Sequence, residues 1–486
     1  MTTSRRNKVR RVAVIGAGPG GLAAAKYLLA ENAFERIDVF EQAHEVGGVW
    51  TYTPEFVKTL KAVPLVDPRV PPEDPLWQTH SSKEAIFPTA MYDSLETNIP
   101  NILMQYSDLP FPEDSQLFPK RQTVKSYLQD YAKDIIQLIR FQTQVLSVQP
   151  HGESGQWLLK ARNLSSGSET ETEDIYDGVV VANGHYSVPY LPAVKGITAW
   201  NEEYPGVISH SRFYRNPEPF KNKKVIIVGN SASGLDIGAQ IGTVCKPKLI
   251  VSSQSASYLS PGPEQYKEEY PEIEEFISGR RAVRFRDGRV VEDIDAIVFC
   301  TGYLYSFPFL PGLTPPVVSD GSRTQHVYQH IFYNDRPTLA FIGLPQKIIP
   351  FPVSEGQAAV ISRVWSGRLT LPDKSEMEQW EDAEVSDRGA GKAFHTLMFP
   401  LDADYLVSLH EWALEAQTKD GLQNNGRGKI PPTWGDRERW MRERFPAIKH
   451  AFAAKGEERH RIKTIEDLGY DYEAWRQEND EASKLL

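Results

Sequence analysis

The stretch Val12–Glu41, VAVIGAGPGGLAAAKYLLAENAFERIDVFE, decides the fold of this chain. A β-branched apolar run is followed by Gly16, Gly18 and Gly21, then by an alanine-rich helical pattern and a second apolar run. Glycines at this spacing allow a sharp turn, a close approach of the backbone to a pyrophosphate and tight packing of helix on strand, and the helix N-terminus favours an anion. The stretch therefore predicts a Rossmann unit that binds a dinucleotide.

Glu41 indicates which dinucleotide this unit binds. It ends the second predicted strand about 20 residues after the last glycine, where a carboxylate accepts hydrogen bonds from a ribose 2′-OH. The acid favours FAD or NAD and disfavours a 2′-phosphate. Because glycine turns between strand and helix also serve packing alone, a nucleotide fold that has lost its ligand is the alternative.

The composition indicates a globular protein of about two to four domains, with 486 residues of which 40% are hydrophobic. The net charge of −10 comes from 54 basic and 64 acidic residues, without a long basic run after the first eleven positions, which argues against nucleic acid as a partner. No window offers ~18 uninterrupted apolar residues, so we expect neither a membrane span nor membrane binding. Cys245 and Cys300 are expected to be core thiols in a reducing, cytoplasmic setting.

The rest of the first domain alternates irregular and regular patterns. Proline and aromatic residues crowd Pro54–Pro119, and an ordered loop of this length typically covers a cofactor or substrate. Arg121–Ile139 has the period of an amphipathic helix, and Ile139–Gln149 with Trp157–Ala161 predicts a hairpin. Val179–Ala182 predicts a buried strand.

A second unit repeats the opening pattern. Lys223–Val228 predicts a strand, GNSASG at Gly229–Gly234 a turn, and Leu235–Ile241 a helix. Ser231 replaces the middle glycine; it is still small, and its hydroxyl adds a hydrogen-bonding group for phosphate. The next predicted strand ends at Ser253 and Gln254 instead of an acid, which permits NADPH, although no Arg is present there to select it.

The fold class expected is α/β, with two Rossmann-like dinucleotide-binding domains. The strand Asp295–Cys300 runs into Thr301 and Gly302, which resembles the earlier passage Ala182–Gly184. We interpret these as the two crossings between domains. Residues 1–185 would form the first part of an FAD-binding domain, residues 186–302 an inserted NADPH-binding domain, and residues 303–486 the second part with a C-terminal extension.

The sequence resembles the flavin-containing monooxygenase family, the class B flavoprotein monooxygenases. The most specific match is YPGVISHSRFY, in which Tyr204, Gly206, His210 and Tyr214 follow the family pattern FxGxxxHxxxY except for the first aromatic residue. Further matches are GGVW at Gly47–Trp50, Thr97-Asn98, NGHYSVPYLP after Ala182, CTGYLYSFPFL from Cys300, and Glu355 with Gln357. They cover most of residues 1–360, suggest a soluble microbial or fungal-like member, and leave the charged segment after Gly421 unassigned.

The resemblance implies an enzyme that uses FAD, NADPH and O2 to transfer one oxygen atom, through a C4a-hydroperoxyflavin, to a soft nucleophilic nitrogen or sulfur of a small molecule. The cofactor carries the oxidant, so the protein has to supply two nucleotide sites and a dry pocket. Asn98 matches the family's active-site asparagine; the alternative is a loop Asn that caps its own backbone before Pro100. The sequence leaves open whether the chain forms a homo-oligomer.

Other site residues follow from the same comparison. Trp50 is expected along the flavin, unless it only packs in the core, and Gln357 is expected to reach the isoalloxazine, with Glu355 solvated or capping. His210 is more often a structural group than a proton donor, and the histidines show no metal-ligand spacing, so no metal is expected. The cofactor-binding set is Gly16, Gly18, Gly21, Glu41, Gln42, Gly48, Trp50, Val145 and Gln357 for FAD, and Gly229, Ser231, Ser233, Gly234, Ser253, Gln254 and Thr301 for NADPH or the crossing.

Three other functions compete with this interpretation. A Baeyer–Villiger monooxygenase acting on a ketone shares the cofactors, but Tyr214 stands where those relatives carry Trp. A pyridine-nucleotide flavin reductase without oxygenation shares the plan, and its disulfide-reducing members need a redox dithiol that Cys245 and Cys300 do not form. A non-catalytic flavin-fold escort protein is disfavoured by the second glycine turn.

Overall fold

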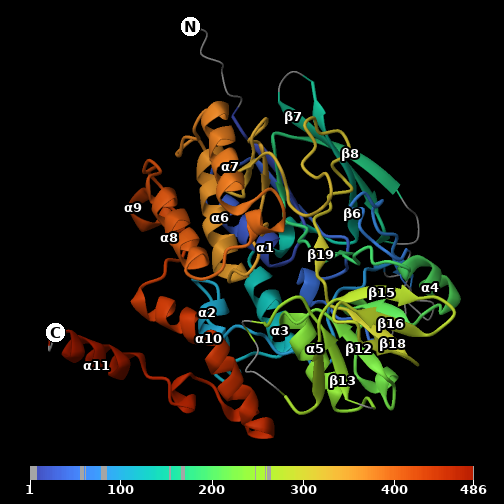
Figure 1. Cartoon of the computed structure of the whole chain (residues 1–486). Coiled ribbons are helices and arrows are strands. Elements are labelled where there is room, and N and C mark those ends of the chain that lie inside the picture. The colour runs from blue at the N-terminus through green and yellow to red at the C-terminus, as the bar shows by residue number, and fades with distance from the viewer. Residues whose placement is uncertain are drawn as a thin grey trace.

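The computed structural model describes residues 8–54, 60, 62–77, 85–152, 155–165, 170–246, 248–257, 259 and 264–484. Figure 1 shows an upper lobe that holds both early and late parts of the chain, and a lower lobe built from its middle. Each lobe is built on one main sheet, which is mostly parallel in the upper lobe and wholly parallel in the lower one. The α/β fold with two Rossmann-like units is confirmed.

The sheet of the upper lobe has seven strands with β1 (Arg11–Ile15) near its middle, in the order β20-β21-β22-β9-β1-β2-β5. Strand β1 pairs in parallel with β2 (Arg36–Phe40) and β9 (Gly178–Val181). Val12 and Val14 belong to one core cluster and Ala13 and Ile15 to another, so alternate side chains of β1 fill both faces of the sheet. The remaining strands are β5 (Ile139–Arg140), β22 (Leu339–Phe341) and the antiparallel pair β20 (Val327–Tyr328) and β21 (Phe332–Tyr333).

Helices cover one face of this sheet and an antiparallel sheet covers the other. The helical core contains α1 (Pro19–Ala30), α3 (Arg121–Ala132), α6 (Pro350–Trp365) and α8 (Leu401–Leu414). The second layer is β6 (Thr143–His151), β7 (Gln156–Asn163) and β8 (Thr170–Tyr176).

Two local expectations need correction here. Helix α3 ends at Ala132 instead of Ile139, because a 3-10 turn at Ile136–Leu138 leads into β5. Strand β8 was not expected, since its sequence TETEDIY is mostly exposed and lacks the apolar alternation of a half-buried strand.

The lower lobe repeats the arrangement with a five-stranded parallel sheet in the order β11-β18-β12-β13-β14. Its strands are β11 (Ile208–His210), β12 (Val225–Val228), β13 (Leu249–Ser252), β14 (Lys267–Tyr270) and β18 (Ala296–Phe299). Helix α5 (Ala232–Gly242) covers one face. Helix α4 (Ile197–Glu203) and the antiparallel strands β15 (Ile273–Ile277), β16 (Ala282–Phe285) and β17 (Val290–Val291) cover the other.

Two chain connections join the lobes and run side by side. Strand β10 (Val188–Pro189) pairs in antiparallel fashion with β19 (Tyr303–Leu304). In the chain, β10 follows β9 of the upper sheet, and β19 follows β18 of the lower sheet. The lobes are therefore linked by a double connection.

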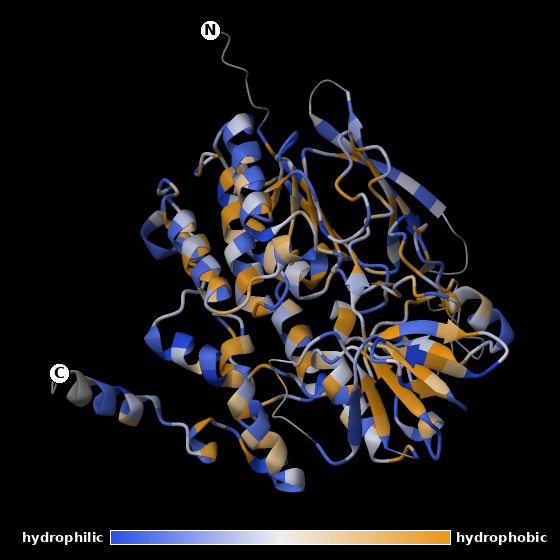
Figure 2. Ribbon diagram, in the orientation of Figure 1, coloured by the Kyte–Doolittle hydropathy of each residue, from blue (hydrophilic) through white to orange (hydrophobic). Residues whose placement is uncertain are grey.

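Irregular segments and terminal helices complete the fold. The described part of Pro54–Pro119 holds only β3 (Leu76–Trp77), β4 (Ala85–Ile86) and α2 (Asn101–Met104). The C-terminal third adds α7 (Lys374–Arg388), α9 (Gln423–Gly426), α10 (Asp436–Ala454) and α11 (Tyr472–Lys484). Figure 2 shows apolar residues concentrated on the strands and inward helix faces, while α11 lies at the edge of the molecule.

The cysteines differ in exposure, and neither forms a disulfide. Cys300 is buried as expected, but Cys245 is only half-buried, because it lies beyond the end of α5 where the chain returns to the surface. Among the described residues, no helix has both the length and the apolar character required to cross a membrane.

Candidate active site

The first glycine turn uses its three glycines for different reasons. Gly16 has φ +104°, and a Cβ there would lie 2.7 Å from the Ala182 carbonyl oxygen. A Cβ on Gly21 would lie 1.8 Å from the Gly16 carbonyl oxygen. A Cβ on Gly18 would meet only the backbone of Gly48, at 3.3 Å from its Cα. The packing of the protein thus requires glycine at positions 16 and 21. At Gly18 the fold itself leaves room for a side chain, so this space is open to a ligand.

The ends of β1 and β2 fit an FAD. Helix α1 has no side-chain cap at its N-cap, Gly18, and no acid in its first turn, so its N-terminal N–H groups and dipole remain for a pyrophosphate. Glu41 Oε2 accepts the N–H of Ala17 and Oε1 that of Ala43, both at 2.8 Å. Each oxygen keeps a lone pair for a ribose hydroxyl. Burial raises the pKa of Glu41, and the two N–H donors oppose this shift.

Further residues predicted to contact FAD are placed as follows. Gly48 has φ +55° in the turn that faces Gly18. Trp50 ends the 3-10 helix Gly48–Trp50 and is partly buried against the helical core. Val145 buries its side chain in the second core cluster beside a bulge between Val145 and Ser147, so only its backbone is left to meet a ligand. Gln42 is half-buried directly after Glu41.

The second glycine turn reproduces the packing of the first. A Cβ on Gly229 would lie 2.7 Å from the Cys300 carbonyl oxygen, and one on Gly234 would lie 2.0 Å from that of Gly229. Ser231 is the N-cap residue of α5, whose first turn has no acid. Its Oγ accepts a 2.7 Å hydrogen bond from Lys347 Nζ, which comes from the upper lobe. The free N–H groups at the start of α5 fit a second dinucleotide. Lys347 joins the two lobes here, and no sequence motif indicated it.

Of the other residues predicted for the NADPH site, some are open to solvent and one already makes a hydrogen bond within the protein. Ser233 and Gln254 are exposed, and Ser253 is half-buried. The Thr301 hydroxyl donates to the Tyr190 carbonyl oxygen, so it supports the connection between the lobes. Two arginines that follow β13 in the chain could replace the missing Arg, but both are paired elsewhere: Arg280 with Glu292, and Arg281 with Asp295 at 3.2 Å.

Asn98 lies in a loop whose neighbours are firmly held. Thr97 N donates to the Pro119 carbonyl oxygen at 2.9 Å, and Thr97 Oγ1 donates to that of Ile99 at 2.8 Å. The half-buried Asn98 side chain forms no hydrogen bond with any part of the chain that the structure describes. The backbone cap that was the alternative role is therefore not seen, and the amide is available to a ligand.

His210 has a structural role, as its context predicted. Its Nδ1 accepts the N–H of Arg212 at 3.1 Å, which leaves Nε2 protonated to donate to the Gly302 carbonyl oxygen at 3.0 Å. Burial lowers the pKa of His210 to about 3, so the ring stays neutral. Tyr214, the last residue of the same motif, donates to Gln240 Oε1 of α5 at 3.0 Å. The motif ties the connection between the lobes to the second unit.

The expectation for Glu355 was wrong, because α6 is buried on nearly every side. Glu355 is fully buried and accepts hydrogen bonds from Tyr27 Oη and from the N–H and hydroxyl of Ser107. Burial raises its pKa to about 7. Gln357 is equally buried: Oε1 accepts the Gly343 N–H at 2.9 Å and Nε2 donates to Tyr405 Oη at 3.0 Å. Its amide is committed to the protein, which favours support of the Gly343 turn over direct contact with the flavin.

Buried histidines form a separate cluster. His330 and His395 place their Nδ1 atoms 3.1 Å apart, and burial lowers the pKa of both rings. In the part of the chain that the structure describes, no three His, Cys, Asp or Glu side chains are grouped so that they could hold a metal ion.

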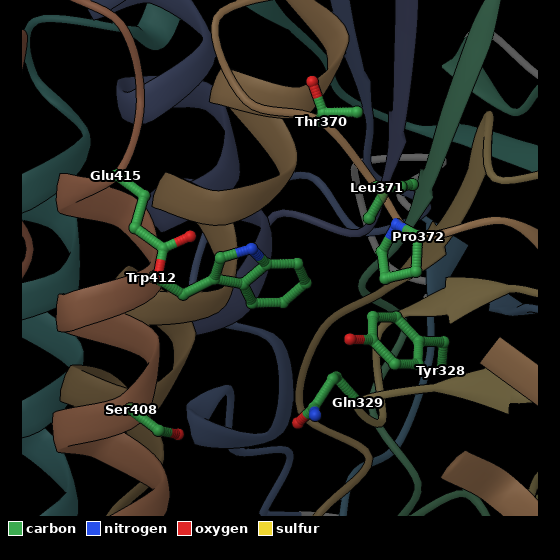
Figure 3. Close-up of a pocket in the computed structure, with 8 residues that line it drawn as sticks. All are labelled: Tyr328, Gln329, Thr370, Leu371, Pro372, Ser408, Trp412 and Glu415. Carbon is green, nitrogen blue, oxygen red and sulfur yellow. The ribbon is translucent and has the colours of Figure 1, made fainter. Parts of the chain in front are cut away.

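A cavity of about 390 Å³ lies elsewhere in the upper lobe. Figure 3 shows Tyr328 and Trp412 among the residues that line it, with their rings edge to face and the ring centres 5.9 Å apart. Glu415 and Ser408 come from the same helical segment as Trp412. No residue of either glycine turn lines it, and Asn98 does not line it. This cavity is therefore separate from both glycine turns and from Asn98.

Comparison with known proteins decides the family. The family model described as "Flavin-binding monooxygenase-like" matches residues 74–273 and 265–424, and that described as "NAD(P)-binding Rossmann-like domain" matches residues 14–60. The chain is 38% identical over 385 residues to "Flavin-containing monooxygenase FMO GS-OX-like 2" of Arabidopsis thaliana, with 76% of each chain covered. The chain belongs to the flavin-containing monooxygenase family.

Solved structures extend this similarity to the whole fold. The structure of S-allyl-L-cysteine S-oxygenase from Allium sativum is 27% identical, has a TM-score of 0.74, and covers 98% of this monooxygenase and 99% of its own chain. An open crystal structure of cyclohexanone monooxygenase, at 13% identity and a TM-score of 0.53, shares the fold alone. The named relative is a plant protein, as is this S-oxygenase, so the expected microbial or fungal-like kinship is not borne out.

This monooxygenase is accordingly an NADPH-dependent, FAD-containing oxidoreductase. It transfers one oxygen atom from O2 to a soft nucleophilic nitrogen or sulfur of a small molecule. Residues after 424 lie beyond the family match, although the S-oxygenase structure covers nearly the whole chain.

Proposed function

We propose that this monooxygenase oxidises the sulfur of a small thioether, with Asn98 as its catalytic residue. The observation that carries the assignment is the Asn98 amide, which makes no hydrogen bond with the described residues while its neighbours are held. Sulfur is favoured over nitrogen because the S-allyl-L-cysteine S-oxygenase matches nearly the full length of the chain.

The residues of the protein bind and orient the cofactors and the substrate, and they exclude water. Bound FAD, reduced by NADPH, supplies the activated oxygen when O2 reacts with it. The overall balance is NADPH, H⁺, O2 and thioether giving NADP⁺, water and sulfoxide. The Asn98 amide donates a hydrogen bond beside the oxidant without offering an acidic proton. His210 cannot compete as a base because both ring nitrogens are bonded and its pKa is lowered.

The domain assignment belongs to the same proposal. Residues 1–185 and 303–486 bind FAD, and residues 186–302 bind NADPH, which is supported by the membership of the two sheets and by the β10–β19 connection. The predicted cofactor-binding residues keep these roles, with Gln357 and Thr301 acting through backbone positions that they support. A cytoplasmic location is supported by the two cysteines without a disulfide.

The test measures coupling in Asn98→Ala and Asn98→Ser. Both variants should keep FAD and oxidise NADPH, but release peroxide in place of sulfoxide, because the positioned donor is lost. Asn101→Ala is the matched control, since Asn101 Oδ1 already accepts the N–H of Ile102 at 2.7 Å. Unchanged sulfoxide yield per NADPH in the Asn98 variants would refute the assignment. Tertiary amines and cyclic ketones presented in parallel identify N-oxygenation or lactone formation by product.

A further inference from the structure

Helix α10 lies outside the family match yet packs against the loop that carries Asn98. The match ends at residue 424, whereas α10 spans Asp436–Ala454 and is followed by a 3-10 helix at Gly456–Arg461. Figure 1 shows α10 below α8, toward the lower lobe. The sequence left this charged segment without a role.

Lys449 of α10 holds the residue before Asn98. Its Nζ donates a 2.8 Å hydrogen bond to the Thr97 carbonyl oxygen. That carbonyl shares a rigid peptide plane with the N–H of Asn98, so fixing one end of the plane fixes where the Asn98 side chain begins. The Lys449 ammonium also lies 4.6 Å from the centre of the Phe118 ring and 5.4 Å from that of Phe452, and both rings attract the cation.

The segment after α10 holds the other side of the same loop. Arg459 Nε lies 3.2 Å from Glu96 Oε2, and Leu117 N donates to the Ile462 carbonyl oxygen at 2.8 Å. Gln116 Nε2 donates to Glu96 Oε1 at 3.1 Å. The C-terminal segment therefore contacts the loop through both side chains and backbone.

The charge of Lys449 also faces the NADPH lobe. Burial lowers the pKa of Lys449, while the carboxylates of Glu96 and of Asp236 on α5 favour its charged form, and Arg459 opposes it. Asp236 in turn accepts the hydroxyl of Tyr92, which lies at the start of the Asn98 segment. Lys449 is thus a cation that acts on α10, the Asn98 loop and α5 together.

We propose that Lys449 is a positioning residue for oxygenation, through which helix α10 fixes Asn98 against both lobes; this rests on the proposed role of Asn98. Loss of the contact leaves FAD binding and NADPH oxidation intact, because Lys449 touches neither glycine turn. It misplaces the Asn98 amide, so O2 is released as peroxide: NADPH, H⁺ and O2 give NADP⁺ and H2O2, without transfer to sulfur.

The experiment compares Lys449→Met with Lys455→Met in the full-length holoenzyme. Met keeps the aliphatic stem but removes the donor, and Lys455 is an exposed lysine just beyond the same helix. Because misplacement by ~1 Å can cost ~100-fold in rate, we expect sulfoxide formation to fall about tenfold or more in Lys449→Met, with KM for NADPH and FAD content unchanged. Lys449→Arg, which keeps a cationic donor, should restore part of the coupling, and Lys455→Met should match the wild type.

The outcomes separate this inference from the role of Asn98. Adding Lys449→Met to Asn98→Ala should cause little further uncoupling, since both changes act on one amide. Full coupling in Lys449→Met, or a lower melting temperature with coupling intact, overturns the inference while leaving Asn98 catalytic. Full coupling in Asn98→Ala refutes the proposed function instead. If the Met variant does not fold, Lys449→Gln, which is too short to reach Thr97, replaces it with the same expected loss of coupling.

Discussion

Substitution of Gly18 by Val should remove FAD while leaving the fold in place. Gly18 has φ −79° and ψ −174°, an extended conformation open to any residue. Its added Cβ would meet only the Gly48 backbone, at 3.3 Å from the Cα, a contact relieved by a shift of a few tenths of an ångström. The added side chain would instead occupy the space in which the pyrophosphate approaches the N-terminus of α1.

The expected magnitude follows from the N–H groups that the phosphates would lose. A hydrogen bond to a charged group contributes about 1.5–3 kcal/mol, so losing two costs roughly 3–6 kcal/mol, or roughly 10²- to 10⁴-fold in the Kd for FAD. Gly21→Ala differs in kind, because its Cβ would lie 1.8 Å from the Gly16 carbonyl oxygen and must disrupt the turn itself.

The assay is titration of the deflavinated protein with FAD, followed by the quenching of flavin fluorescence, with circular dichroism as the check on folding. Gly238→Ala is the control: Gly238 lies inside α5, and its Cβ would make only a 3.4 Å contact with Leu249 of β13. Gly18→Val should appear folded without flavin, and Gly238→Ala should bind one FAD. Stoichiometric FAD in purified Gly18→Val would refute the position of the pyrophosphate.

Two further predictions concern the nucleotide preference and the pH dependence of stability. Gln254→Arg should raise the ratio of kcat/KM for NADPH over NADH by roughly ten- to a hundredfold. This factor corresponds to one charged hydrogen bond of about 1.5–3 kcal/mol. A wild-type ratio that is already in the thousands and does not rise would show that another cation holds the 2′-phosphate. Burial raises the pKa of Glu355 from 4.5 to about 7, so the folded protein retains a proton that the unfolded chain releases, and the free energy of unfolding should fall as pH rises through this range and then level off. Chemical denaturation of the wild type and of Glu355→Gln across pH 4–9 checks this, and an equal slope in both would contradict it.

The active site was only partly predictable from the sequence. Both glycine turns and Glu41 follow from short sequence patterns. The structural role of His210 is local only in part: its Nδ1 accepts the N–H of Arg212, whereas its Nε2 bonds Gly302, 92 residues away. Glu355 was predicted wrongly, since a charged residue on a helix indicates solvent unless the surrounding elements are known. Lys347 and Lys449 carried no signal at all, as their partners Ser231 and Thr97 lie more than a hundred residues away.

The sequence by itself determined the two Rossmann units and the family, because strand and helix periods, glycine spacing and a terminal acid are set by short-range geometry. Only the tertiary structure decided which polar groups remain available for a ligand. Gln357 and Thr301 are committed to Gly343 and Tyr190, whereas the Asn98 amide makes no bond with the described residues. The physical reason is that a hydrogen bond depends on separation in space, and burial brings together groups that are far apart in the chain.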